Sequence, residues 1–478
     1  MYISTRNKEI QVSSKEAIIQ GISEDGGLFV LPDLDQIQID LHQIIENDYQ
    51  ENAYLILKNL LPDFAECQLR ECIHNAYTNT FLKEEITPIK KVGDIYVLEL
   101  FHGPTSAFKD VALMLLPQLM SCALKDVNKK ALILTATSGD TGKAALNGFC
   151  DVDHIGIEVF YPDQKVSAIQ YRQMATQKGK NVAVYGIRGN FDDAQSHVKM
   201  LFLDKDLKAK LDQKDILLTS ANSINIGRLV PQIVYYFESY KYLVQKQVIA
   251  LGESVCFSVP TGNFGDVLAG YYAYRMGLPV KRFYVASNAN HVLTDFLQTG
   301  IYDRNRDFLQ TISPSMDILI SSNLERLLYY MSDGDCELVS KCMDDLKVHG
   351  KYRIPKLILE KIQALFGCGY VEDEMTKQVI RKVYEETQVV LDPHSAIGYK
   401  VAMDSKEETI ISLATASPYK FEEDVLSSLG LQGNLETICQ DPKPKGLKEV
   451  EALTLLHTDV IDIQEMKQSI YKTVGVCL

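Results

Sequence analysis

The spacing of apolar residues changes character along the chain. Between Gln36 and Leu82 apolar positions recur at helical intervals, and no strand-like run interrupts them. From Ile95 onward, short runs rich in β-branched and aromatic residues alternate with longer amphipathic stretches. This pattern predicts a helical N-terminal domain, residues 1–90, followed by an α/β core.

Strand–helix alternation of this kind predicts doubly wound, mostly parallel sheets. We expect strands at residues 95–100, 131–134, 155–160, 182–185, 255–259, 282–285 and 410–413. A long amphipathic helix is expected over 224–245, with a kink or restart at Pro231. The core, residues 91–300 and 390–478, is expected to form two lobes.

Residues 301–389 interrupt the alternation. A charged loop at 303–307 precedes helical runs at 324–331, 356–365 and 375–386. We interpret this region as a helical insertion or lid that returns to the sheet at Thr409. Prolines at 442 and 444 then predict a turn before a final helix near Val450.

Composition narrows the possible functions. The 478 residues are 46% hydrophobic and 23% charged, as in globular proteins of two or three domains. A net charge of −14 disfavours nucleic acid as a partner. No apolar run reaches the length of a bilayer span and the first residues lack a signal-peptide core, so we expect a cytoplasmic protein without membrane contact. The ten cysteines are scattered without zinc-site spacing, which predicts reduced thiols and no metal.

The segment FHGPTSAFKD, residues 101–110, places Lys109 just after a turn and at the start of an apolar helix. Burial there would disfavour the ammonium form and lower the pKa of the amine, as nucleophilic amine chemistry requires. The alternative is a lysine whose stem packs on the core while its ammonium group reaches water. His102, beside this motif, is a second candidate site residue.

Two strand-to-helix turns are candidate anion sites. Ser138, Gly139, Asp140 and Thr141 follow the strand expected at 131–134, and Gly262, Asn263, Phe264, Gly265 and Asp266 follow the strand at 255–259. Glycines in such turns allow backbone N–H groups to converge at a helix N-terminus, which suits phosphate or carboxylate. The first turn is not a P-loop, because only two residues separate Gly139 from Gly142. Ordinary helix caps are the alternative for both.

A third turn, after the strand at 410–413, carries Thr415, whose hydroxyl can donate to a heteroaromatic nitrogen. An amine nucleophile, anion cradles and a neutral donor together match pyridoxal 5′-phosphate chemistry. Lys109 would then bind the cofactor aldehyde, the 262–266 loop its phosphate, and Thr415 would face the ring nitrogen. His394, which follows Asp392 and Pro393, is interpreted as a structural turn histidine.

These motifs, in this order, resemble the threonine synthase family, in its longer microbial and fungal type. The resemblance runs from the N-terminus to about Asp424. It rests on YISTR (2–6), EDGGLFV (24–30), HGPTSAFKD (102–110), TATSGDTGKAA (135–145), NSINIGR (222–228), PTGNFGD (260–266), SNAN (287–290) and SPSMDILISSNLERLL (313–328). Ser106 and Ser417 depart mildly from the family pattern.

The resemblance implies the fold of type II pyridoxal-phosphate enzymes and conversion of O-phospho-L-homoserine and water to L-threonine and phosphate. It implies that Lys109 is the Schiff-base lysine and that the 138–141 turn receives the substrate carboxylate. Ser223, Asn225 and Arg228 are our candidates for the substrate phosphate. A surface salt bridge is the alternative for Arg228.

Two other classes of function stay open at this point. One is a phospholyase or dehydratase of the same fold, which would release a keto acid instead of threonine. The other is a non-catalytic descendant that only binds a ligand or partner. The sequence fits either a monomer or a homodimer.

Overall fold

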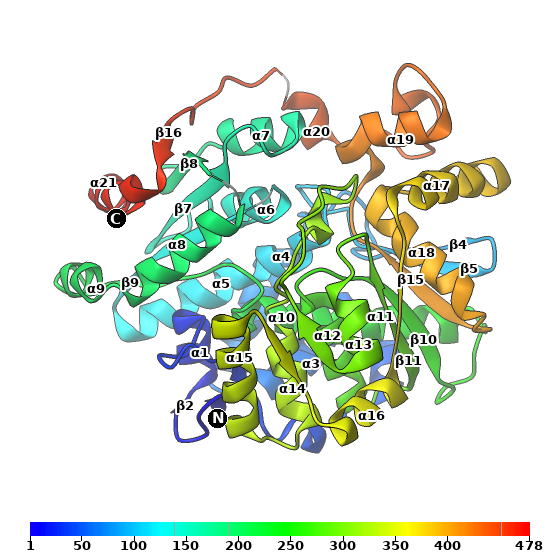
Figure 1. Cartoon of the computed structure of the whole chain (residues 1–478), viewed down its shortest axis with the longest axis horizontal. Helices are drawn as coiled ribbons and strands as arrows, with labels where there is room; N and C mark the ends of the chain where they lie inside the picture. The colour runs from blue at the N-terminus through cyan, green and yellow to red at the C-terminus, as the bar shows by residue number, and fades with distance from the viewer. Residues whose placement is uncertain (138, 190, 451) are drawn as a thin grey trace.

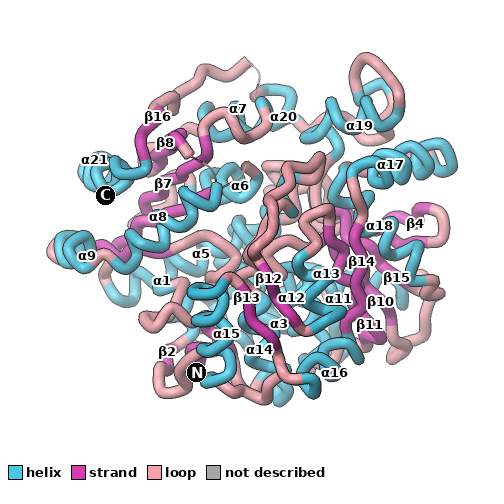
Figure 2. The backbone as a smooth tube through the Cα atoms, viewed as in Figure 1, coloured by secondary structure: helices cyan, strands magenta, loops and turns pink. Residues whose placement is uncertain are grey.

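Two mostly parallel sheets lie side by side (Figure 1). Helix α5 (Lys109–Val127) connects them, since it follows a strand of the larger sheet and precedes the first strand of the second sheet. The computed structural model describes residues 1–137, 139–189, 191–450 and 452–478. The tube in Figure 2 shows the strands of each sheet flanked by helices, as the alternating pattern predicts. The predicted fold class, α/β with doubly wound and mostly parallel sheets, is confirmed.

The larger sheet has the strand order β14-β11-β10-β15-β5-β4 and is parallel except for the β4–β5 pair. Its strands are β4 (Ile89–Val92), β5 (Ile95–Glu99), β10 (Val255–Pro260), β11 (Val280–Ser287), β14 (Phe366–Tyr370) and β15 (Ile410–Ala414). The second sheet, β16-β8-β7-β6-β9, is parallel throughout. Its strands are β6 (Lys130–Ala136), β7 (Ile155–Pro162), β8 (Val182–Arg188), β9 (Ile216–Thr219) and β16 (Val460–Asp462).

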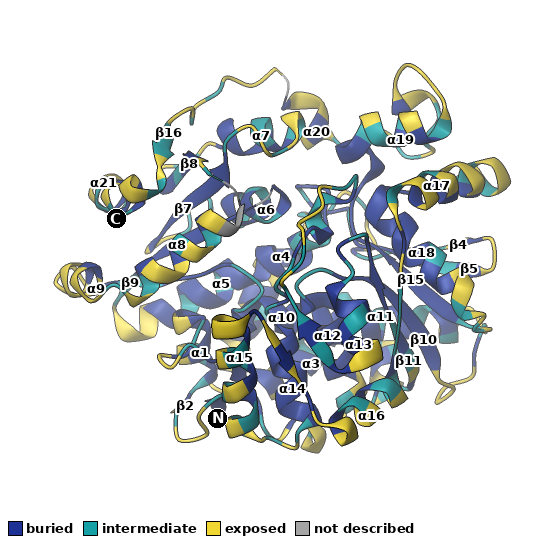
Figure 3. Cartoon of the chain, in the orientation of Figure 1, coloured by how far each residue is buried: buried dark blue, intermediate teal, exposed yellow. Residues whose placement is uncertain are grey.

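Helices cover both faces of the sheets, so the central strands are buried on both sides (Figure 3). Every residue of β7 and β10 is buried, which is why their sequences are mostly apolar, apart from Glu158 and Ser258. The α-helices are α1 (Ser14–Gln20), α2 (Leu41–Glu46), α3 (Tyr49–Leu60), α4 (Glu66–Tyr77), α5, α6 (Asp140–Phe149), α7 (Ala168–Ala175), α8 (Phe191–Leu203), α9 (Lys205–Asp212), α10 (Ile226–Leu229), α11 (Ile233–Gln245), α12 (Gly265–Arg275), α13 (Val292–Thr299), α14 (Leu324–Met331), α15 (Cys336–His349), α16 (Lys356–Leu365), α17 (Asp373–Thr387), α18 (Pro393–Ser405), α19 (Glu422–Leu429), α20 (Lys445–Glu449) and α21 (Met466–Cys477). Among the described residues, no helix is both long and apolar enough to cross a membrane.

The N-terminal region contains the expected helices, together with a small sheet that the pattern did not indicate. Strands β1 (Tyr2–Ser4), β2 (Gln11–Val12) and β3 (Phe29–Val30) pair antiparallel. Strands of two or three residues are too short to produce a visible alternation. The long helix expected over 224–245 is interrupted as predicted, because a 3-10 turn at Val230–Gln232, which contains Pro231, separates α10 from α11.

The prediction that the chain returns to the sheet only at Thr409 is wrong. The preceding strand β14 already pairs with β11 and forms the edge of the larger sheet. Its sequence, FGCGY, directly follows α16 and contains two glycines, so it carries little strand propensity. A two-stranded sheet, β12 (Ile301–Asp303) with β13 (Lys351–Arg353), also lies within this region beside the expected helices.

The C-terminal end extends further than predicted. The helix expected near Val450 is the short α20, and the chain then adds β16 to the second sheet and ends in α21. Helix α21 packs on β7, where it covers Glu158. That carboxyl accepts a hydrogen bond from Ser469, while its other oxygen has no hydrogen-bond partner within the described part of the chain. Burial raises the pKa of Glu158 to about 7.

Because the folded-state pKa of Glu158 lies above its unfolded value, the stability it contributes is present at acidic pH and is lost as pH rises through about 7. We expect Glu158→Gln to remove this loss, so that between pH 5 and pH 8 the variant gains up to about 3 kcal/mol relative to the wild type. Thermal unfolding midpoints measured across that range test this. An exposed acid, Glu71→Gln, is the control. A constant offset between Glu158→Gln and wild type would contradict the assignment.

Candidate active site

A pocket opens where β6, β10 and β15 end, so residues from both sheets form its wall. The carboxyl ends of parallel strands are the usual ligand sites of open α/β sheets. The wall includes eleven of the predicted site residues: Lys109, Asp140, Thr141, Ser223, Arg228, Gly262, Asn263, Phe264, Gly265, Asp266 and Thr415. Five separate segments of the sequence therefore meet in one place.

Lys109 is the first residue of α5, and its side chain is 11% exposed. Its Nζ lies 3.9 Å from Oδ2 of Asp140 and 4.7 Å from the ring centre of Phe108. Burial lowers the pKa of the Lys109 amine to about 8, against the attraction of Asp140, and the positive charges of Arg228 and Lys420 lower it further. A substantial fraction of the amine is thus unprotonated near neutral pH, as a nucleophile requires.

The turn before Lys109 is held by Asp110. Its carboxylate accepts hydrogen bonds from the backbone N–H of Thr105 at 2.8 Å and from the Thr105 hydroxyl at 2.6 Å. Gly103 packs so closely that a Cβ there would lie 2.3 Å from Cβ of Asp110. The Phe108 N–H donates to the carbonyl of Thr415 at 2.8 Å, which ties the turn to the end of β15.

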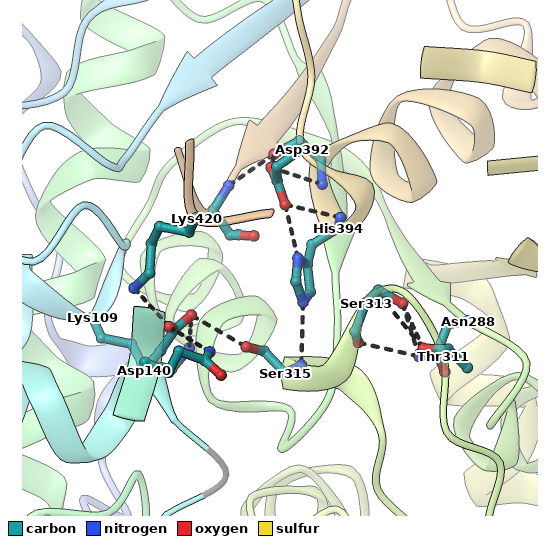
Figure 4. Close-up of polar contacts among 12 residues, drawn as sticks. Lys109, Asp140, Asn288, Thr311, Ser313, Ser315, Asp392, His394 and Lys420 are labelled. Atoms are coloured by element: carbon teal, nitrogen blue, oxygen red, sulfur yellow. Dashed lines mark hydrogen bonds and ion pairs between the residues drawn. The ribbon is translucent and has the colours of Figure 1, made fainter. Parts of the chain in front are cut away.

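Asp140, at the start of α6, is the centre of the polar network in Figure 4. Oδ1 lies 2.6 Å from Nζ of Lys420 and accepts from Nε2 of Gln170 at 3.0 Å. Oδ2 accepts from the Ser315 hydroxyl at 3.2 Å and faces Lys109. The nearby lysines hold the pKa of Asp140 well below its usual range, so this buried carboxyl is an anion.

The 262–266 loop forms a narrow cradle before α12. Phe264 has a φ of 60°, and a Cβ on Gly262 would lie 3.1 Å from the carbonyl oxygen of Ser315. Ser321 donates to the Gly262 carbonyl at 2.8 Å, and Asn323 donates to the Asn263 carbonyl at 3.0 Å. The loop carbonyls are thereby bonded, while the first-turn N–H groups of α12 have no acceptor within the helix. This arrangement suits a phosphate.

Asp266 follows this cradle in the first turn of α12. Its Oδ1 accepts from the hydroxyls of Tyr235 at 2.6 Å and Tyr236 at 2.9 Å, so the carboxyl joins α11 to α12. Its other oxygen lacks a hydrogen-bond partner among the residues described. Burial raises the pKa of Asp266 to about 6.

Arg228 lies on α10 and is buried on the pocket wall. Its guanidinium donates to the carbonyl of Ala221 at 2.9 Å, and no carboxylate pairs with it in the described part of the chain. Burial lowers the pKa of Arg228 to about 10. A buried cation without a protein counter-charge is expensive unless an anion binds it, so this residue indicates a site for an anionic ligand group.

Two predicted residues do not line the pocket. Asn225 is not on the pocket wall, because its side chain caps α10 by accepting from Gly227 N–H at 2.9 Å and donates to the carbonyl of Ile18 at 2.9 Å. Gly139 lies behind the wall, with its N–H bonded to Thr137, and a Cβ there would lie 2.3 Å from Cδ of Gln170. Ser138 lies outside the described residues.

The two histidines exchange the roles that the sequence suggested. His102 is not on the pocket wall, since its ring pairs with Glu99 at 2.7 Å on the far side of the turn. His394 does line the pocket, with Nδ1 2.7 Å from Asp392 and Nε2 accepting from the Ser315 N–H at 3.1 Å (Figure 4).

The sequence pattern predicted no role for three further residues near Lys109, namely Ser315, Gln170 and Lys420. Two of them had a signal: Ser315 lies in the 313–328 segment that carries the family resemblance, and Lys420 lies in a Pro-x-Lys-Phe segment at 418–421.

Models of known families match almost the whole chain. "Threonine synthase N terminus" matches residues 1–77, "Pyridoxal-phosphate dependent enzyme" matches 75–412, and "Threonine synthase, C-terminal" matches 395–472. The chain belongs to the threonine synthase family of pyridoxal-phosphate-dependent enzymes. The resemblance inferred from the motifs is thus confirmed, as are the fold type and the cofactor.

Individual relatives agree. The threonine synthase of Saccharomyces cerevisiae is 36% identical, with 98% of this chain and 97% of that protein covered. Human threonine synthase-like 1 is 38% identical over 91% of this chain and 62% of its own length. The crystal structure of pyridoxal-phosphate-bound threonine synthase from Brucella melitensis superposes with a TM-score of 0.89 at 35% identity, covering 99% of both chains.

The charge of Arg228 yields a direct prediction. With pyridoxal phosphate bound, so that the α12 cradle is filled, we expect Arg228→Met to weaken binding of inorganic phosphate by about tenfold or more, since a charged hydrogen bond is lost. Isothermal titration measures this. Arg188→Met, at an exposed arginine that pairs with Asp462, is the control. Equal phosphate affinity in the Arg228 variant and wild type would rule out this residue as the anion ligand.

Proposed function

We propose that this chain is a threonine synthase that converts O-phospho-L-homoserine and water to L-threonine and phosphate. The observation that carries the proposal is that the buried Lys109 amine and the buried Arg228 guanidinium lie on the same pocket wall. Arg228 has no carboxylate partner among the described residues. An amine nucleophile and a separate phosphate site are what a phosphorylated amino-acid substrate needs. The names of the full-length relatives agree with this reaction.

The pocket residues fit pyridoxal phosphate. Lys109 would hold the aldehyde carbon, the 262–266 loop would hold the phosphate, and Thr415 would face the ring nitrogen. The Thr415 backbone is fixed on both sides, because its N–H donates to Ser395 at 3.2 Å and its carbonyl accepts from Phe108. When bound, the cofactor supplies an electron sink conjugated to the substrate amine. A threonine partner leaves the ring nitrogen largely neutral, whereas an aspartate would keep it protonated.

Lys109 also suits proton transfer at the substrate. Its amine, with a pKa of about 8, can accept and return a proton near neutral pH. The first residue of a long helix is a fixed position, so the amine stays within reach of the bound amino acid. Asp140, 3.9 Å away, can stabilise the ammonium form while it holds the proton.

The substrate would be held at both of its anionic ends. Arg228 and Ser223 would receive the phosphate, while Asn225 would act only by capping the helix that carries Arg228. Within the predicted 138–141 turn, Thr141 lines the pocket and would receive the carboxylate. The Asp140 side chain is an anion already paired with Lys420, so it is not itself a carboxylate ligand. We further propose a cytoplasmic protein that acts as a monomer or homodimer, without a metal.

The main alternative is a phospholyase or dehydratase of the same family. One observation favours it: the chain is 38% identical to human threonine synthase-like 1, whose name states a likeness to threonine synthase and not the activity itself. A non-catalytic descendant is the other, and a purified protein that does not bind pyridoxal phosphate would favour it.

Product analysis separates these functions. Purified protein loaded with pyridoxal phosphate and given O-phospho-L-homoserine should release threonine and inorganic phosphate in equal amounts, because water replaces the phosphate within one molecule. Both products are quantified in the same sample, together with any 2-oxo acid. Phosphate release accompanied by 2-oxo acid, without threonine, would identify the lyase alternative.

A second prediction tests the role of Lys109. Lys109→Met should abolish threonine formation, with a loss of at least about 10³-fold, because the chain then lacks its nucleophile. The matched control is Lys143→Met. Burial also lowers the pKa of Lys143 to about 8, but its Nζ bonds Gln177 and it is absent from the pocket wall. Equal losses in both variants would contradict a specific role for Lys109.

A further inference from the structure

Lys420 is a fully buried lysine that contacts Asp140 of the active site but does not line the pocket. It lies on the short 3-10 helix at Pro418–Phe421, after β15, and its side chain is 0% exposed. Its Nζ pairs with Oδ1 of Asp140 at 2.6 Å and donates to the carbonyl of Thr105 at 3.1 Å (Figure 4). Asp140 follows a strand of the second sheet, whereas Lys420 follows a strand of the larger sheet, so this ion pair joins the two lobes.

The backbone around Lys420 is held against the turn that carries Lys109. Ser417 N–H donates to the Ser106 carbonyl at 3.1 Å, and Ala107 and Ala416 form an isolated antiparallel bridge. The position of the Lys420 ammonium is thereby set relative to the start of α5. A buried ammonium needs fixed acceptors, and Asp140 with Thr105 supplies them.

A continuous set of contacts then leads from Lys420 to the reactive amine. Asp140 receives Lys420 and Gln170 on one oxygen, and Ser315 and Lys109 approach the other. The Ser315 backbone is held in turn by His394. Because one oxygen is saturated, the other is directed towards Lys109.

We propose that Lys420 is a positioning residue that holds the Asp140 carboxylate beside Lys109 and so fixes the orientation and charge of the reactive amine. Lys420 is absent from the pocket wall, so it acts through Asp140 and not on the substrate. This role deepens the proposed function and rests on it.

The charges that face Lys109 determine the sign of the effect. Asp140 and Asp110 favour its ammonium form, whereas Arg228 and Lys420 oppose it. Asp266 also lies close enough for its carboxyl to be influenced by Lys109. Removing the positive charge of Lys420 leaves Asp140 without its main partner, which must raise the pKa of Lys109. Removing the charge of Asp140 must lower it.

The test measures the amine itself in the cofactor-free full-length chain. The rate of Lys109 acylation by acetic anhydride is followed across pH 6–10 by peptide mass spectrometry. We expect the midpoint, near 8 in the wild type, to move up by about one pH unit in Lys420→Met. In Asp140→Asn, which removes a charge 3.9 Å from the amine, it should move down by about one pH unit or more. Lys420→Arg, which keeps the charge, should stay near the wild-type value.

The proposal stays testable if Lys420→Met does not fold. Should Lys420→Met not fold, Lys420→Gln, which removes the charge but keeps a hydrogen-bond donor for Oδ1 of Asp140, should still raise the midpoint. An unchanged midpoint in a folded variant that has lost the Lys420 charge overturns the positioning role, even where wild type makes threonine. Opposite shifts in Lys420→Met and Asp140→Asn support the role, and failure of wild type to make threonine would then overturn only the proposed function. In an active enzyme, Lys420→Met should lower kcat by about tenfold or more with KM little changed.

Discussion

Burial of the Lys109 amine is the constraint on which the site depends. An ammonium group loses its hydration inside the protein, so the neutral form gains population and the nitrogen becomes a nucleophile near neutral pH. The cost would be prohibitive without a nearby counter-charge. Asp140 supplies that charge at 3.9 Å and is itself held by the fully buried Lys420. Lys109 therefore belongs to an ionic cluster in which two lysines share the Asp140 carboxylate.

The fold places these groups together without any of them being neighbours in sequence. The carboxyl ends of β10 and β15 in the larger sheet and of β6 in the second sheet meet at the pocket, so the loops after these strands converge on the start of α5. Glycines at two of these loops provide the space that the approach of Ser315 and Gln170 needs. Arg228 enters from α10, the short helix separated from α11 by the Pro231 turn.

Much of the candidate site could be predicted from the sequence, because a motif at the end of a strand indicates both the strand-to-helix turn and the chemical groups that the turn carries. Lys109, the 262–266 loop and Thr415 were predicted that way as parts of one site, and the structure places them on one pocket wall. Asn225 was misjudged, because a cap residue and a ligand residue look alike beside a helix start. His102 and His394 were misjudged for a related reason, since nearness in sequence to Lys109 does not decide which side of a turn faces the pocket.

Other features left almost no trace in the sequence. Strand β14 has two glycines and joins the sheet through a long-range pairing with β11, and β16 is only three residues long. Neither has enough alternation to be recognised locally. The importance of Lys420 depends on Asp140, which lies 280 positions earlier in the chain. Contacts of this kind follow from tertiary packing and become visible only in the folded structure.

The central claim is that Lys109 is the residue to which pyridoxal phosphate attaches. Borohydride reduction of the cofactor-loaded protein, followed by proteolysis and mass spectrometry, identifies the labelled amine directly. The account predicts one phosphopyridoxyl group per chain, on the peptide that contains Lys109. A label on Lys143, Lys420 or another lysine, or no label at all, would contradict it.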